Sequence, residues 1–551
     1  MLARYFRTLR HLRPSQWLGQ LKVRVCRRNP ARLSSAGEIP GRMVSQAVLV
    51  GLPSPVPAQP PEDLKAGRFT FLSETRSLGR TPDWDVPEAS RLWRYNLHYF
   101  DWLWSLLPTA APDWETARDL TLKWIANHPP TRHACGWEPY PTSLRVLNWS
   151  LLFGIRHRER TAADPAFRDA LLVSLQRQVE WLEGNLETHI QANHLLENLA
   201  ALVCAHSSFA WNDSPHPPPH ILRHLRHELD EQILGDGMHY ERSPMYHLRM
   251  LWIIEAMRMA GPAQWHQPLA DLSRKMKRAL SLLRHPDGGI PLLNDSALGI
   301  YADGWTHELT DDGPWALPEA GYYGARAGGD FVVIDAGPIG PDHQPGHAHA
   351  DFFSFELSLG GQRVMTDTGV ATYDRGAVRD YDRSTAAHNT VEVDGDNSVE
   401  VWGAFRVGRR TRPKINTWQP TAEHFVLDAE HEGYLHLPAR AVHQRRFAWQ
   451  PGCFEISDEL RVRQTSEAVA RIHFAPGVEL RVDGMTAHGR VGDAGFHIET
   501  TGADSLSLEQ SMYHPTFNQA VPRSVLCLRL RAHPPKQAWT IRVRWDHTCR
   551  S

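Results

Sequence analysis

Apolar residues recur every three or four positions through the first half of the chain, from about residue 90 to residue 310. This is the period of a helix with one buried face. Turn residues rich in Pro and Gly separate the segments that show it, which are 101–107, 114–127, 143–156, 165–185, 193–206, 219–234, 243–259 and 269–285. Consecutive helices without strands between them predict paired antiparallel helices, as in an α/α toroid or a large bundle.

The pattern changes near residue 320, where short runs of β-branched and aromatic residues begin. Strands are expected at 330–334, 351–359, 363–366, 390–393, 425–429, 454–457, 469–474 and 538–545. Gly, Asp or Pro punctuates them, which is typical of an antiparallel sandwich and not of βαβ units. The chain is therefore predicted to be multidomain α+β. We expect a leader and linker at 1–85, an α/α toroid at 86–318 and an antiparallel β-sandwich at 319–551.

The N-terminal segment is basic and amphipathic. Residues 1–32 contain nine Lys or Arg and no acidic residue, and Leu2, Phe6 and Leu9 are spaced for one helical face. Such a helix can lie on an anionic membrane or on a glycan-assembly partner; the alternative is a solvated leader packed on the main body. The Pro-rich stretch 50–62 predicts an extended linker.

Composition narrows the class of protein. A length of 551 residues predicts two or three domains. The net charge of −2 predicts no bulk affinity for nucleic acid. Six scattered cysteines without a CxxC pair predict neither a disulfide framework nor a thiolate zinc site. No apolar run reaches the roughly 18 residues of a membrane span, and no secretory signal is recognisable. The expected location is the cytoplasm, with the periplasm or secretion by a non-standard route as alternatives.

The chemistry-bearing residues of the second half lie around one expected strand. His347, His349 and Asp351 alternate, so one strand face would carry all three as a metal triad. Asp367 ends the next expected strand and His388 precedes a third, so antiparallel pairing could instead gather His349, Asp367 and His388. Nitrogen and oxygen donors of this kind suit zinc or a similar divalent ion. The alternative is a wet strand end lined with polar residues.

Two helix starts of the first half carry further candidates. Asn193 and His194 lie where a helix should begin, which fits either a ligand-facing pair or a plain N-cap with a surface His. Tyr246 lies in the first turn of a helix, where the macrodipole favours a phenolate and so general acid–base chemistry. Arg242 beside it could bind an anionic group. The alternative is a buried aromatic residue beside a structural salt bridge.

Two clusters, 92–100 and 136–145, mix aromatic and basic residues. Tyr and Trp faces stack on sugar rings, and guanidinium groups bind carboxylates. The clusters therefore predict a groove for charged sugars, although toroid cores also bury many aromatic residues. The candidate sugar contacts are Trp93, Tyr95, Trp137, Tyr140 and Arg145. A further stretch, 291–296, follows the last expected helix, and no role is assigned to it.

The sequence resembles the heparinase II/III-like polysaccharide lyases, which include related alginate and oligoalginate lyases. The matching features are 92–100, 137–149, Asn193-His194, 241–246, 346–351, Asp367 and His388-Asn389. The resemblance implies an active site between the toroid and the sandwich, with Asn193 and His194 facing a uronate. Tyr246 is implied as proton donor or base, and His347 as a residue that reaches the substrate from the sandwich.

The resemblance also implies a structural Zn²⁺ held by His349, Asp367 and His388, with Asp351 supporting a ligand. The activity implied is β-elimination at a uronic acid of an anionic polysaccharide, linked to bacterial surface-polysaccharide metabolism. A first alternative is a glycoside hydrolase, which needs two carboxylates; Glu138, Glu197 and Glu241 are the candidates. A second alternative is a non-catalytic glycan-binding or scaffold protein.

Overall fold

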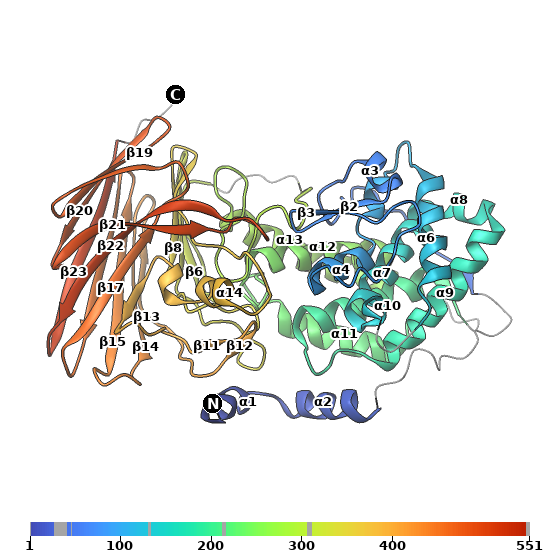
Figure 1. Cartoon of the computed structure of the whole chain (residues 1–551), viewed down its shortest axis with the longest axis horizontal. Helices are drawn as coiled ribbons and strands as arrows, with labels where there is room; N and C mark the ends of the chain where they lie inside the picture. The colour runs from blue at the N-terminus through green and yellow to red at the C-terminus, as the bar shows by residue number, and fades with distance from the viewer. Residues whose placement is uncertain are drawn as a thin grey trace.

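The computed structural model describes residues 2–26, 41–45, 47–130, 134–211, 216–305 and 311–546. Helices of the first half and antiparallel sheets of the second half form two bodies side by side (Figure 1). The predicted order, an N-terminal α/α toroid followed by a C-terminal antiparallel β-sandwich, is confirmed.

The helical domain is built around α10 and α7, which pack against each other and are buried along most of their length. Its helices are α4 (Arg91–Tyr99), α5 (Leu103–Leu106), α6 (Trp114–Asn127), α7 (Pro139–Leu151), α8 (Arg158–Ala163), α9 (Pro165–Gly184), α10 (Ala192–Ser208), α11 (Pro219–Gln232), α12 (Pro244–Ala260) and α13 (His266–Leu283). Residues 92–99 of the aromatic cluster lie in the helix α4, whose start is capped by Ser90, which accepts a hydrogen bond from the Trp93 backbone amide.

Part of the stretch predicted as a linker packs into the helical core. It contains α3 (Pro61–Lys65) and the hairpin of β2 (Arg68–Phe71) and β3 (Glu74–Ser77). Leu64 and Phe69 are fully buried, and the Phe69 ring meets Trp102 edge-on at 5.2 Å between centroids. Prolines hold this chain extended, and the apolar residues between them supply the contact. A two-strand pair, β1 (Arg42–Met43) with β4 (Phe209–Ala210), also ties the early chain to the helical domain.

Three sheets form the second domain. The first, nearest the helices, has the order β5 (Gly313–Leu317), β6 (Tyr322–Ala327), β7 (Asp330–Asp335), β8 (Phe355–Leu359) and β9 (Gln362–Met365). The second has the order β13 (Lys414–Pro420), β14 (Phe425–Tyr434), β15 (Ala441–Gln450), β16 (Cys453–Arg461), β23 (Lys536–Trp545), β20 (Ala494–Thr501), β19 (Thr486–Val491) and β18 (Glu479–Asp483). The third has the order β10 (Val391–Val393), β17 (Ser466–His473), β22 (Val521–Ala532) and β21 (Ser505–Tyr513).

Burial alternates along β14, β15 and β16, as expected for strands with one face on a core. Phe355 meets the rings of Phe447 and Phe454 edge to face in that core, and Phe447 and Phe454 stack on each other. Two small elements complete the domain: the helix α14 (Ala377–Asp382) and the strand pair β11 (Val401–Trp402) with β12 (Arg406–Val407).

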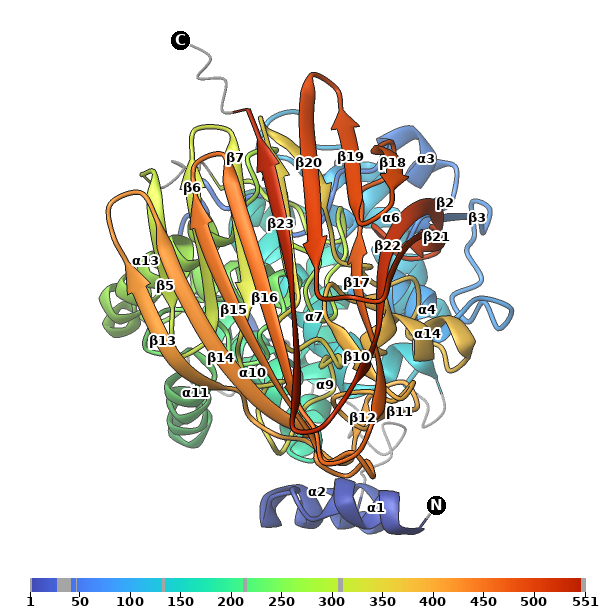
Figure 2. The same cartoon turned by 90° about the vertical axis from the view of Figure 1, so that its left-hand side faces the viewer.

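Two N-terminal helices, α1 (Leu2–Leu9) and α2 (Pro14–Cys26), lie outside both domains along one edge of the molecule (Figures 1 and 2). The predicted leader thus packs on the main body: Arg7 Nε donates to Glu400 Oε2 of the sandwich at 2.7 Å, and Arg13 pairs with Glu231 of α11. Every helix in the described ranges is too short or too polar to span a bilayer.

Candidate active site and metal centre

The start of α10 presents Asn193 and His194 at the boundary with the sandwich. Gln191 and Ala192, just before them, have φ of 66° and 53°, a left-handed backbone that non-glycine residues rarely adopt. The backbone N–H of Asn193 donates to Glu241 Oε1 at 3.2 Å, so the carboxylate of Glu241 satisfies one of the free N–H groups of this helix start. Local strain of this kind is common at ligand-binding sites.

His194 is held on two sides. Its ring stacks on Tyr140, with 4.0 Å between centroids and 21° between planes. Its Nδ1 lies 3.2 Å from Glu187 Oε1, and the other Glu187 oxygen accepts from Asn198 at 3.1 Å. Burial lowers the pKa of His194, but the Glu187 carboxylate outweighs it and raises the pKa above 6.5. With Nδ1 occupied and 26% of the side chain exposed, Nε2 is the nitrogen free to accept a proton.

Tyr246 crosses the domain boundary. Ser243 caps α12 by accepting from the Tyr246 amide at 3.2 Å. The Tyr246 ring stacks on His347 at 3.9 Å between centroids, and its hydroxyl lies 3.2 Å from that of Tyr373. Burial, reinforced by Tyr373, raises the pKa of Tyr246 well above 10. Burial thus acts against the phenolate that the helix start was expected to favour, and it keeps Tyr246 a neutral phenol at neutral pH.

Asp295 joins the His347 site to a second cluster. Its Oδ2 lies 2.9 Å from His347 Nδ1 and its Oδ1 lies 2.9 Å from His349 Nε2. Arg379 of α14 makes a bidentate contact with the same carboxylate. His347 Nε2, on its other side, is 3.5 Å from Glu241 Oε2. Glu241 and Asp295 therefore connect Asn193 of the helical domain to both histidines of the sandwich.

We expect Asp295→Asn to lower the free energy of unfolding by about 3–5 kcal/mol, because Arg379 would keep a buried charge without its carboxylate. Urea unfolding measures this. The matched control is Asp342→Asn, whose partner Arg412 is 67% exposed. A pair of that kind contributes about 0–1 kcal/mol. Equal effects of the two substitutions would contradict a buried hub at Asp295.

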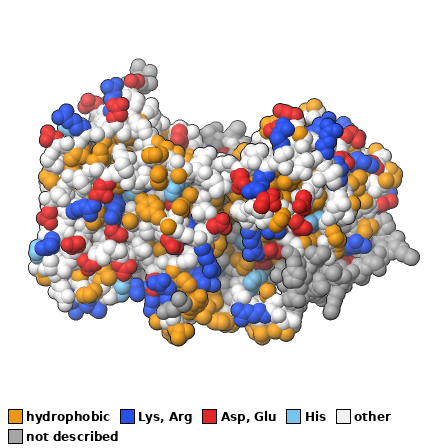
Figure 3. Space-filling model, in the orientation of Figure 1, with side chains coloured by type: hydrophobic (Ala, Val, Ile, Leu, Met, Phe, Trp, Pro, Cys, Tyr) orange, Lys and Arg blue, Asp and Glu red, His pale blue; other side chains and the backbone are white. Residues whose placement is uncertain are grey.

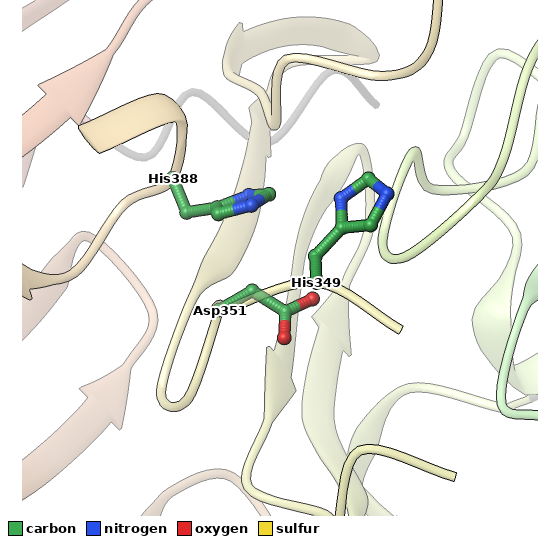
Figure 4. Close-up of side chains that lie close together, drawn as sticks. All are labelled: His349, Asp351 and His388. Atoms are coloured by element: carbon green, nitrogen blue, oxygen red, sulfur yellow. The ribbon is translucent and has the colours of Figure 1, made fainter. Parts of the chain in front are cut away.

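A buried group of side chains that could hold a metal ion lies next to Asp295. One atom each of His349, Asp351 and His388 lies within 4.8 Å of the other two, and all three side chains point into a common space (Figure 4). His349 Nδ1, Asp351 Oδ2 and His388 Nε2 are buried and have no hydrogen-bond partner among the described residues. Buried polar atoms are normally satisfied, so three convergent exceptions fit a cation.

The convergent group differs from the predicted ligand set in one residue. Asp367 points to the other side of His388: both of its oxygens lie 2.9 Å from His388 Nδ1, and it also accepts from Ser354 and Thr368. Asp351 takes its place among the three convergent groups. Each imidazole thus has a carboxylate on its second nitrogen, Asp295 for His349 and Asp367 for His388, as metal-binding histidines usually have. The strand triad that included His347 is also wrong, because His347 faces Tyr246.

Three of the predicted sugar contacts lie in the helical core. Trp93 and Trp137 donate their indole N–H groups to the Glu74 and His128 carbonyls at 3.1 Å each, and both side chains are buried. Arg145, also buried, lies over the Trp124 ring at 4.0 Å. These residues therefore pack the toroid, because burial in the core leaves them no face for a substrate.

Arg242 is also engaged elsewhere. Its guanidinium donates to the backbone carbonyls of Tyr240, Glu319 and Ala320 at 2.9 to 3.1 Å, which ties the start of α12 to the turn between β5 and β6. Its donors are turned away from the Asn193–Tyr246 site toward these carbonyls.

Tyr95 and Tyr140 do lie beside His194. Tyr140 forms the stack described above, and its hydroxyl donates to Glu197 at 2.8 Å. Tyr95 and His194 line a cavity of about 190 Å³ together with Glu138, Glu187 and Lys22.

The carboxylates needed by a hydrolase are committed to other partners. Glu138 binds Arg91 and the Tyr95 hydroxyl. Glu197 is fully buried, with Arg249 at 2.9 Å. Glu241 accepts from the Asn193 amide. A glycoside hydrolase needs two carboxylates on either side of the glycosidic bond, and the contacts of these three glutamates do not provide such a pair.

Sequence reasoning missed Asp295, Tyr373 and the positioning roles of Glu187 and Glu241. Asp295 lies in the stretch 291–296 that had no assigned role, so its position after the last helix was the only signal. Tyr373 lies in a loop before α14 with no local pattern around it. Both act through contacts with residues far away in the sequence, which periodicity does not report.

Comparison with known proteins adds the family. Residues 73–310 match the family model described as Heparinase II/III N-terminus, and residues 310–546 match Heparinase II/III-like, C-terminal. The heparin-sulfate lyase of Pedobacter heparinus is 26% identical over 418 residues, which cover 67% of this chain and 60% of that protein. FtsZ-localized protein C of Caulobacter vibrioides is 26% identical over 440 residues, covering 74% and 71%.

The chain spans less than two thirds of the two heparin-sulfate lyases it matches, 60% of the Pedobacter protein and 54% of the Bacteroides stercoris protein. Among solved structures, Heparinase III superposes with a TM-score of 0.69 at 15% identity, over 92% of this chain and 88% of that one. Heparan sulfate lyase HepC from Pedobacter heparinus gives 0.59 at 21% identity, over 98% and 88%. These likenesses show a common fold, and the matches over residues 73–546 show that the chain belongs to the heparinase II/III-like family.

Proposed function

We propose that this protein is a polysaccharide lyase that cleaves a uronic-acid-containing, anionic polysaccharide by β-elimination. The observation that carries the proposal is the meeting of Tyr246 with His347 across the domain boundary, connected through Glu241 to the backbone of Asn193, the residue before His194. The site thus combines a neutral phenol, a carboxylate-held imidazole and an amide. Two relatives named heparin-sulfate lyase support the same chemistry.

The first half of the reaction removes the C5 proton of the uronate. That proton is weakly acidic, so the substrate carboxylate must be neutralised as the enolate-like intermediate forms. The Asn193 side-chain amide is the donor proposed for this charge. His194 is the proposed base, since Glu187 holds Nδ1 and leaves Nε2 to take the proton.

The second half breaks the C4–O4 bond, forms the C4=C5 double bond and leaves O4 in need of a proton. Tyr246 is the proposed donor, because its raised pKa keeps the phenol protonated. The Tyr373 hydroxyl, 3.2 Å away, orients the phenol, and the His347 ring stacked on it fixes the ring plane. His194 and Tyr246 thereby divide the roles of base and acid.

One assay separates this function from its alternatives. Purified protein is incubated with a panel of uronate polymers, and ultraviolet absorbance of an unsaturated product is followed. Absorbance that grows with time supports elimination. New reducing ends without the chromophore would indicate a hydrolase, and binding without either product would indicate a glycan-binding scaffold.

The pH profile of kcat/KM should have a single rising limb controlled by His194. Below its raised pKa, His194 carries a proton and cannot act as a base, so activity should grow as pH rises through that pKa. Tyr246 adds no falling limb below about pH 10. Glu187→Gln removes the carboxylate that raises the pKa of His194. Burial, which lowers this pKa, then dominates, so the rising limb of the profile should move to lower pH. A limb that stays in place in Glu187→Gln would contradict His194 as the base.

We propose Zn²⁺ as the cation for His349, Asp351 and His388. Two imidazole nitrogens and a carboxylate oxygen are ligands that zinc accepts readily. A bound zinc would supply a fixed positive charge that neutralises the buried Asp351, whose pKa burial raises in its absence. It would also join the loop before β8 to the segment before β10, and so brace the backbone that carries His347.

The link to bacterial surface-polysaccharide metabolism stays a prediction, as do the polymer and its uronate epimer. Genomic context tests the first. A gene outside every glycan-assembly cluster in related genomes would contradict it.

A further inference from the structure

The two N-terminal helices carry an outward apolar face. Fourteen large hydrophobic side chains are exposed among the described residues, and eight of them lie in α1 and α2. These are Leu2, Phe6, Leu9, Trp17, Leu18, Leu21 and Val25, together with Tyr5, which is 37% exposed but also contacts the sandwich. Leu2, Phe6 and Leu9 recur at four- and three-residue spacing, the repeat of one helical face. Hydrophobic side chains accordingly gather along the lower edge of the molecule, where these helices lie (Figure 3).

The inward face of the same helices is firmly attached. Tyr5 meets the Trp402 ring of β11 edge-on at 4.8 Å, and Thr8 accepts from the Trp402 indole at 3.1 Å. Under the helical domain, Gln16 is buried and donates to the His343 carbonyl at 3.1 Å, while Gln191 donates to Ser15 at 3.0 Å. The outward face is therefore presented by helices that are fixed to both domains, and its exposure is not the result of a detached segment.

The charge of the segment identifies the surface it fits. Residues 1–32 hold nine basic residues and no acidic one. Arg10, Lys22 and Arg24 have no carboxylate partner within the described part of the chain. Anionic lipid headgroups attract such residues, while Leu, Phe and Trp enter the boundary between headgroups and acyl chains. Helices that stand out along one edge can reach a flat bilayer with both apolar faces at once.

We propose that α1 and α2 form a docking surface for an anionic lipid bilayer. Docking would also bring the proposed site near the membrane, because α2 borders the cavity lined by His194. Lys22 lines that cavity, and a Cβ at Gly19 would lie 2.9 Å from the His189 backbone nitrogen, so α2 packs closely on the segment before α10. A polymer held at a lipid surface would then meet the lyase beside its point of attachment.

The test is co-sedimentation of the full chain with vesicles of phosphatidylcholine alone or mixed with phosphatidylglycerol. We expect binding to the mixed vesicles that weakens with added salt. Phe6→Ser/Leu21→Ser should lower the affinity by at least about tenfold, since both side chains would otherwise leave water. Arg10→Gln/Lys22→Gln/Arg24→Gln should lower binding to the mixed vesicles alone.

The matched control is Leu508→Ser/Met512→Ser, which removes two exposed hydrophobic side chains of the sandwich. It should bind like the unchanged protein, and melting temperatures should agree for all variants. Absence of binding to the mixed vesicles, or an equal loss in the control, would overturn the proposal. So would a dimer, seen by light scattering without vesicle binding, that Phe6→Ser/Leu21→Ser dissociates, because the face would then belong to a second copy of the chain.

Discussion

Replacing Tyr246 by Phe should lower kcat for elimination by about 10²–10⁴-fold, the usual contribution of a positioned general acid. The substitution removes the hydroxyl but keeps the ring that stacks on His347, so the domain boundary should stay intact. Stopped assays of the unsaturated product measure the loss, and an unchanged melting temperature shows that the fold is preserved.

Exchange of the C5 proton separates the two possible roles of Tyr246. In heavy water, Tyr246→Phe should still exchange this proton, because His194 removes it, whereas His194→Ala should not. Tyr373→Phe is the matched control: it removes the hydroxyl 3.2 Å away and should have a smaller effect, as Tyr373 acts through Tyr246. Loss of C5-proton exchange in Tyr246→Phe would indicate that Tyr246 is the base. Undiminished elimination by Tyr246→Phe would show that Tyr246 takes no part in the reaction.

Asp351→Asn should abolish metal binding and with it part of the stability of the sandwich. A structural zinc contributes folding free energy directly, so the melting temperature should fall together with the metal content. Elemental analysis of the purified protein and thermal unfolding, with and without a chelator, measure the two effects. His349→Ala should behave in the same way.

The informative comparison is Asp367→Asn. Asp367 contacts His388 Nδ1, on the far side of the ring from the convergent atoms, so its loss should weaken metal affinity by about 10–100-fold without abolishing binding. The reverse ranking, with metal retained in Asp351→Asn and lost in Asp367→Asn, would restore the ligand set inferred from the sequence. Unchanged metal content in both variants and in His349→Ala would contradict the proposal of a metal site at these residues.

The hydrophobic periodicity of the sequence was sufficient to predict the architecture of the two domains. A 3.6-residue repeat followed by short β-rich runs predicts helices packed on helices and then sheet packed on sheet, because each buried face needs a partner of its own kind. The helix start predicted at residue 243 is also observed: Ser243 caps α12 and places Tyr246 in its first turn. Asn193 and His194 do lie at the start of α10.

The sequence-based predictions were less reliable where they assumed that residues close in the sequence also face the same site. Trp93 and Arg145 lie near tyrosines that reach the site, but helical geometry turns them toward the core. Asp351 and Asp367 are both plausible oxygen ligands of one metal. Choosing between them depends on which side of the His388 ring each carboxylate meets, and that is set by the packing of three segments.

The sequence by itself therefore determined the fold, the family resemblance and four residues proposed for the reaction, because periodicity, caps and motif order are properties of neighbouring positions. Only the tertiary structure decided how these residues are connected. Asp295 binds His347, His349 and Arg379 at once, and Glu241 spans from Asn193 to His347. Burial, which no local pattern measures, also decided that Tyr246 remains a neutral phenol.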